Sequence, residues 1–179
     1  PLTTYPSPQL VTSNSNPARY RVVCDHFPWP TLRSRPVPVL HVSVNSPLPP
    51  QEALQRLTDF SPARAENWAG VDDNNLTVHG QGDGWAEITE GNKVGWERQR
   101  YTWDAAAGTV SAVTLNSNIW ASGSGWNYTI MPDGTGSRIE VTAVRNGYGI
   151  KGKLVGALLS LVGKRMISSS TTAALAARN

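Results

Sequence analysis

The segment Trp96 to Trp103 carries the side chains best suited to chemistry. Side chains alternate between the two faces of a strand, which would place Trp96, Arg98 and Arg100 on one face and Glu97, Gln99, Tyr101 and Trp103 on the other. An arginine facing an enclosed site would bind a carboxylate, phenolate or enolate and stabilise negative charge that develops during a carbonyl reaction. Alternatively, Arg98 and Arg100 lie on the outer face and pair with Glu87 or Glu140, where a solvated ion pair contributes little.

Aromatic residues are the second candidate set. The chain has seven tryptophans, and most of them lie on or beside a run of expected strands. Large rings suit a pocket that offers apolar area and an occasional polar group, although a tryptophan-rich core is the alternative interpretation. Strand parity predicts that one face of the sheet, taken to be concave, carries Trp126, Tyr128, Ile130, Ile139, Val141 and Ala143. Trp85 and Trp96 are further candidates to line a ligand site.

Other familiar chemistries lack their signatures. His26, His41 and His79 are scattered and have no spaced partner for a triad or a metal site, so no metal and no cofactor are expected. No glycine-rich phosphate loop is present in the required context, and basic and aromatic residues do not cluster as in nucleic-acid-binding motifs. The single cysteine, Cys24, cannot form an intrachain disulfide, which favours a cytoplasmic location.

The elements that would position these residues form an antiparallel meander. Leu40, Val42 and Val44 alternate with polar residues, as in a half-buried first strand. Six further strands are predicted at residues 76–78, 85–90, 96–103, 109–117, 126–131 and 138–145. Glycine-containing turns separate them, and connections this short join antiparallel neighbours, because a parallel crossover needs about a dozen residues.

Helices are predicted at three places. Pro49 and Pro50 suit the first turn of a short helix with Ala53, Leu54 and Leu57 inside, and a second short helix begins near Pro62. A long helix is expected over residues 150–177, with an apolar face that includes Leu154 and Leu158, both expected to line the ligand site. Its three glycines indicate close backbone approach, flexibility or space for a ligand, the alternative being a plain packing role.

The two ends of the chain differ in composition from its middle. Eleven of the thirteen prolines fall in the first fifty residues, so residues 1–37 are predicted to form an extended arm and residues 38–179 a single domain. No acidic residue follows Glu140, whereas six basic residues do. This basic segment is compatible with weak contact with an anionic ligand or membrane surface, the alternative being internal charge balance. Its longest apolar run is too short to cross a bilayer, and no signal sequence is visible.

The predicted order of elements resembles the helix-grip fold of the START and Bet v 1 superfamily (SRPBCC). This order is a strand, two short helices, a meander and a long C-terminal helix. The local sequences WAEITE at 85–90, GSGW at 123–126 and GSRIE at 136–140, together with residues 96–103, resemble its bacterial polyketide cyclase/dehydrase and lipid-transport branch. The resemblance covers residues 38–177 and implies an α+β fold, in which a curved antiparallel sheet of about seven strands grips the C-terminal helix around an apolar cavity.

The resemblance implies a function class but no catalytic residue, because members of this superfamily include carriers, sensors and cyclases. The first hypothesis is binding or carriage of a hydrophobic or amphipathic small molecule, lipid-like or polyaromatic. The second is a polyketide cyclase or dehydratase using acid and base groups in the cavity. Two or more titratable side chains converging in the cavity would favour the enzyme, and the candidates are Arg98, Arg100, Glu87 and Tyr101. The third is an accessory role in which the arm or the basic helix binds a partner or membrane.

Overall fold

The computed structural model describes residues 37–176, which we call the body of the chain. The predicted arm, residues 1–37, therefore lies almost wholly outside the described residues, as do Cys24 and His26. Every helix and strand of the body falls within the range 38–179 that was predicted to form a domain.

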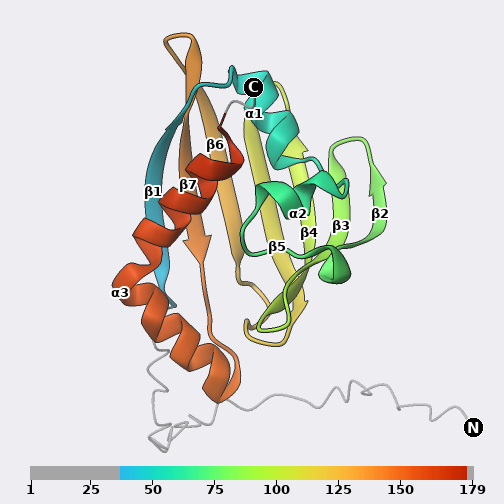
Figure 1. Ribbon diagram of the computed structural model, residues 1–179, viewed down its shortest axis with the longest axis vertical. Helices are drawn as coiled ribbons and strands as arrows, with labels where there is room; N and C mark the ends of the chain where they lie inside the picture. The colour runs from blue at the N-terminus through green and yellow to red at the C-terminus, as the bar shows by residue number, and fades with distance from the viewer. Residues whose placement is uncertain (1–36, 177–179) are drawn as a thin grey trace, which may run out of the picture. The chain divides into compact units, whose positions relative to one another are not determined.

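The body contains one seven-stranded antiparallel sheet (Figure 1). Its strands are β1 (Val39–Ser46), β2 (Thr77–Gly82), β3 (Trp85–Gly91), β4 (Trp96–Asp104), β5 (Thr109–Ser117), β6 (Gly125–Asp133) and β7 (Gly136–Val144). Their order in space is β1-β7-β6-β5-β4-β3-β2, so β2 to β7 form a meander and β1 closes its far side beside β7. The turns use glycine at positive φ, including Gly84 and Gly134, each after an aspartate, as tight hairpins require.

Helices cover one face of this sheet. They are α1 (Pro50–Leu57), α2 (Ala63–Asn67), the single turn η1 (Asp73–Asn75) and α3 (Gly149–Ala174). Proline opens or precedes both short helices, where its missing N–H costs nothing. Figure 1 shows α3 crossing obliquely near β1 and β7, with α1 and α2 over the middle strands. The predicted fold class, an α+β sheet with two short helices and a long C-terminal helix, is confirmed.

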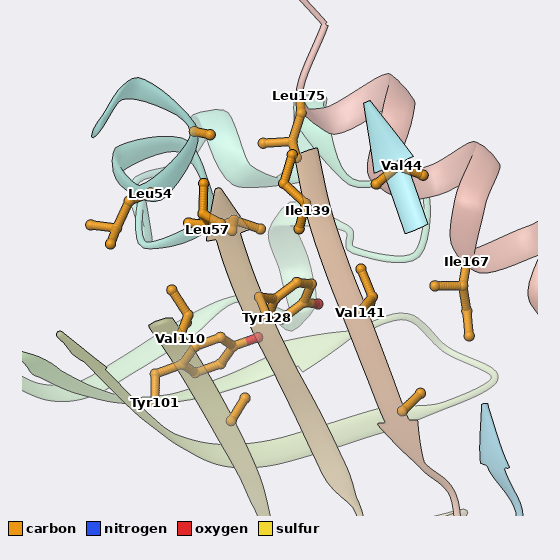
Figure 2. Packing of buried hydrophobic residues seen from close by; sticks show 14 of the residues in the cluster. Val44, Leu54, Leu57, Tyr101, Val110, Tyr128, Ile139, Val141, Ile167 and Leu175 are labelled. Carbon is orange, nitrogen blue, oxygen red and sulfur yellow. The ribbon is translucent and has the colours of Figure 1, made fainter. Parts of the chain in front are cut away.

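A continuous apolar core lies between the sheet and these helices. Figure 2 shows Leu54 and Leu57 of α1, Ile139 of β7 and Leu175 close together at one end of the sheet. Tyr101 and Tyr128 lie further along the same face. The face carrying Tyr128 is thus the covered one; parity groups its residues, and the choice of this face as the concave one was an assumption.

Helix α3 packs mainly by its small residues, and Leu159 is the one leucine within the helix that packs against the core. Its buried positions include Gly152, Gly156 and Gly163, and a Cβ added at Gly163 would lie 2.9 Å from the Leu40 side chain. The backbone of α3 therefore approaches the rest of the body closely, and most of the larger aliphatic side chains take the opposite face, whereas Ile167 is buried in the core. Leu154 and Leu158, expected to line a ligand site, are exposed instead. No helix within residues 37–176 is long and apolar enough to span a membrane.

Candidate functional site

A cavity of about 220 Å³ lies between the covered face of the sheet, α2 and the last turns of α3. Strands β3, β4 and β6 contribute its floor, and the loop after α2 contributes part of its rim. The side chains that line it are mostly aromatic or polar; they are Arg64, Trp68, Val71, Glu90, Glu97, Gln99, Tyr101, Ile119, Trp126, Tyr128, Ile167, Ser170 and Thr171. The cavity thus combines ring surfaces with buried and partly buried polar groups.

One polar group is centred on Arg64 of α2. Its Nε donates to Glu90 Oε2 at 2.5 Å and its Nη2 donates to the Tyr101 hydroxyl at 3.0 Å. Tyr101 in turn donates to Glu90 Oε1 at 2.7 Å, and Arg64 Nη1 donates to the backbone carbonyls of Leu57 and Asp59. Arg64 is 4% exposed, so this ion pair is shielded from water. Short helix α2 is held to β3 and β4 by these bonds.

These contacts move the pKa values of the group away from neutrality. Burial alone would raise the pKa of Glu90, but the charge and hydrogen bonds of Arg64 and the Tyr101 hydroxyl outweigh burial and lower it. Burial, followed by the charge of Glu90, raises the pKa of Tyr101 well above its usual value. Burial also raises the pKa of Tyr128. At neutral pH, Glu90 is therefore ionised and both tyrosines are neutral hydrogen-bond donors.

A second buried pair lies next to the first. Arg145 Nη1 donates to Glu97 Oε1 at 2.6 Å, and Glu97 Oε2 accepts bonds from Gln99 and Thr114. The Arg145 guanidinium stacks at 3.8 Å from the Trp126 ring centroid. Its Nη2 is buried and has no hydrogen-bond partner within the described part of the chain, so the ring face is its main compensation.

The two pairs resolve a conflict that the sheet register creates. Glu90 of β3 lies directly opposite Glu97 of β4, and two like charges in that position repel. Arg64 on one side and Arg145 on the other neutralise them. The two pairs together carry no net charge, and Arg64, Glu90 and Glu97 of the four residues line the cavity.

Tyr128 differs from Tyr101 in its hydrogen bonding. Figure 2 shows the two rings on the same face with their hydroxyls pointing the same way. The Tyr101 hydroxyl is bonded to Arg64 and Glu90, whereas that of Tyr128 has no bonding partner among residues 37–176. Tyr128 also stacks on Trp126, with ring centroids 6.5 Å apart. It therefore offers an aromatic wall and a free hydroxyl to whatever occupies the cavity.

Several residues expected at a ligand site lie on the covered face. Trp126 and Tyr128 line the cavity. Ile130, Ile139 and Val141 belong to the same face but are buried in the apolar core beyond the cavity, together with Ala143.

The other candidates lie outside the cavity. Arg98 and Arg100 are on the opposite face of the sheet, where both pair with Glu87, Arg98 Nε at 2.7 Å and Arg100 Nη1 at 3.8 Å. The Arg100 guanidinium stacks on Trp85, which is therefore on that outer face too. Of the four titratable groups expected to converge, only Tyr101 reaches the cavity. Arg98 and Arg100 lie on the outer face and pair with Glu87, which was the alternative interpretation of the sequence.

Three apolar candidates also fall outside the cavity lining. Trp96 opens β4 beside Gly91, on the parity of Arg98. Leu154 and Leu158 point away from the sheet, because the glycines of α3 occupy the side that packs. Ligand binding by any of these residues would need a site other than the cavity.

The polar groups that sequence reasoning missed are Arg64, Glu90, Glu97, Gln99 and Arg145. A signal existed for two of them, because Glu97 and Gln99 share the parity of Tyr101 in β4. Arg64 had none, since a five-residue helix gives no periodicity from which to read a buried face. The described residues hold no group of three or more histidine, cysteine or acidic side chains that would suit a metal ion.

Comparison with known proteins gives structural matches alone. No protein-family model and no curated sequence matches the chain. Among solved structures, the Zhui aromatase/cyclase from Streptomyces sp. R1128 is similar with a TM-score of 0.64 at 11% identity, covering 78% of this chain and 92% of the other. A truncated norcoclaurine synthase from Thalictrum flavum gives a TM-score of 0.57 at 11% identity, over 77% and 92% of the two chains.

A START superfamily protein from Mycobacterium smegmatis is also similar, with a TM-score of 0.55 at 11% identity, covering 72% of this chain and 93% of the other. At these identities the matches establish the fold and not the activity. The resemblance read from the sequence is confirmed at that level: the chain has the helix-grip fold of START/Bet v 1-like proteins.

Proposed function

We propose that this protein binds a small, amphipathic aromatic molecule in the cavity beneath α3. Proteins of this fold typically bind hydrophobic ligands, and the volume of the cavity limits the size of the ligand that this protein can hold. An engineered protein cavity of about 150 Å³ holds benzene, so about 220 Å³ suits a molecule of one or two rings. A two-chain lipid is too large for it.

The free hydroxyl of Tyr128 is the observation that carries this proposal. It lies in the cavity lining beside the Trp126 ring, and it has no protein partner within the described residues. The hydroxyl is accessible from the cavity, where a ligand hydroxyl or carbonyl would form the hydrogen bond that no described residue supplies. Ring stacking and one polar contact would together orient the ligand.

Binding is favoured over catalysis by the protonation states in the cavity. General acid–base catalysts work best when their pKa lies near the operating pH. Here the pKa of Glu90 is lowered and those of Tyr101 and Tyr128 are raised, so all three move away from neutrality. The Glu90 carboxylate is also occupied by Arg64 and Tyr101, which leaves it a poor base.

An enzyme of the cyclase or dehydratase type is the second candidate. The observation that favours it is the convergence of Glu90, Glu97, Tyr101 and Tyr128 in one cavity lining. A neutral tyrosine can donate a hydrogen bond to the carbonyl oxygen of a poly-β-keto compound as negative charge develops on it. In that case Tyr128→Phe would lower kcat while the exposed control Tyr148→Phe would not.

Native mass spectrometry of the purified full chain, followed by solvent extraction, tests the proposal. An intact one- or two-ring compound released in stoichiometric amount is the expected result. If the extract instead contains a long-chain lipid, the proposed size limit is wrong. Turnover of an added poly-β-keto thioester, followed by chromatography, would replace binding with the enzyme hypothesis.

A further inference from the structure

The outer face of α3 is an apolar surface that nothing in the described structure covers. We call it the outer stripe: Ile150, Leu154, Leu158 and Leu161, which are 82%, 68%, 56% and 84% exposed. Their spacing of four, four and three keeps all four on one side of the helix over about 17 Å. Val162 and Met166, also exposed, border it. Aliphatic side chains gathered in this way mark an interaction surface.

Basic side chains accompany the outer stripe. At 3.6 residues per turn, Lys153 and Lys164 lie along one side of the outer stripe. Arg165 lies in line with the outer stripe, beyond its C-terminal end. Within residues 37–176 these three form no ion pair. Lys151, on the other side, donates to the Val94 carbonyl. No acidic residue follows Glu140, so nothing on the helix offsets this charge.

We infer that α3 docks the protein on an anionic lipid bilayer, with the outer stripe in the interface between headgroups and acyl chains. An apolar face with lysine and arginine beside it is the pattern of a helix that lies in that plane, its long basic side chains reaching up to the headgroups. The helix is not apolar enough to span a membrane, and its glycine face is already packed against the rest of the body. Surface docking uses only the side that no residue among 37–176 covers.

A second copy of the chain fits the same face less well. In a symmetric dimer the outer stripe would meet itself, and the basic side chains of both copies would be brought together without any acidic partner on either helix. Like charges at an interface oppose association, whereas an anionic membrane surface attracts them.

Cosedimentation of the full chain with vesicles tests the inference. The vesicles contain either phosphatidylcholine alone or a 70:30 mixture of phosphatidylcholine and phosphatidylglycerol. We expect partitioning into the mixed vesicles that exceeds partitioning into neutral ones by at least tenfold and weakens with salt, because roughly a fivefold gain is expected per basic residue near the surface.

Two double variants separate the contributions. Leu158→Gln with Leu161→Gln should reduce partitioning at least tenfold, and Lys153→Gln with Lys164→Gln should reduce it for mixed vesicles only. The matched control is Val113→Gln with Leu115→Gln, which alters two exposed apolar residues of β5 and should leave partitioning unchanged. Circular dichroism melts establish that each variant is folded.

The inference is overturned if the wild-type chain stays in solution with both vesicle types, or if the outer-stripe and control variants partition equally. Analytical ultracentrifugation of the same samples supplies the alternative. A dimer that the Leu158→Gln, Leu161→Gln variant dissociates, without vesicle binding by the wild type, would assign the outer stripe to a second copy.

Discussion

The inner and outer faces of β3 and β4 carry the same residue types in different environments. On the outer face, Glu87 pairs with Arg98 and Arg100, which are 45% and 41% exposed. On the inner face, Glu90 and Glu97 pair with Arg64 and Arg145, which are 4% and 2% exposed. Glu87 and Glu90, three residues apart in β3, therefore lie in an exposed and a buried ion pair, respectively. Residue type alone does not distinguish the exposed pair from the buried one; the surrounding structure does.

Burial changes what an ion pair is worth. An exposed pair contributes about 0–1 kcal/mol, because water already solvates both charges. In a buried pair, the attraction between the two charges offsets the hydration that both have lost. Removing one partner therefore leaves the other charge buried without a counter-ion. The inner pairs hold α2 and the end of β7 to the cavity floor, whereas the outer pairs cover a solvated surface.

The largest expected loss of stability comes from removing the counter-ion of a buried charge on the inner face. Arg64→Met should lower the free energy of unfolding by about 3–5 kcal/mol, because Glu90 loses its counter-ion and stays buried. Arg98→Met, the matched change on the outer face, should cost less than about 1 kcal/mol. Urea denaturation at pH 7 measures both. Equal losses in the two variants would break the comparison between the faces.

Removing both charges of the Arg64–Glu90 pair should destabilise the fold less than removing Arg64 alone. Arg64→Met combined with Glu90→Leu should regain about 1–2 kcal/mol relative to Arg64→Met alone, since no unpaired charge remains. The Tyr101 hydroxyl would lose two partners, which limits the recovery. A double variant less stable than Arg64→Met, again by urea denaturation, would mean that the stranded charge is not what makes the single variant unstable.

Acid titration sharpens the comparison further. The folded pKa of Glu90 lies below its value in the unfolded chain, so its ion pair stabilises the fold fully above about pH 4.5 and progressively less as the pH falls through the folded value. Glu90→Gln should therefore be less stable than wild type at pH 7 and show a flatter decline between pH 5 and pH 3. Glu87→Gln is the matched change on the outer face, and thermal melts across this range compare its curve with those of Glu90→Gln and the wild type.

Much of the fold could be predicted from the sequence because its signals are local. Glycine turns bounded the strands, prolines marked the two short helices, and parity placed Trp126 and Tyr128 on one face. The face of α3 could not be read in the same way, because the spacing of its leucines is equally suited to a core and to an exposed surface. The close approaches at Gly152 and Gly163, together with the buried Ile167, show which side packs.

The cavity itself depends on pairings between segments distant in the sequence. Arg64 meets Glu90, and Arg145 meets Glu97, across 26 and 48 residues. Parity showed that Glu97 and Tyr101 oppose Arg98 and Arg100, but not which group faces inward. The irregularity in the pairing of β4 with β5 places its extra residue, Leu115, in β5, so Glu97, Gln99 and Tyr101 keep one parity along β4.

Titration of the full chain with 2-naphthol and with naphthalene, followed by fluorescence, tests the account most directly. If the cavity binds aromatic molecules through the free Tyr128 hydroxyl, Tyr128→Phe should weaken 2-naphthol binding by about fivefold and leave naphthalene binding unchanged, since one hydrogen bond is worth about 1 kcal/mol. Tyr148→Phe, an exposed control, should change neither. Failure of wild-type protein to bind either compound, or equal losses for both compounds in Tyr128→Phe, would contradict the account.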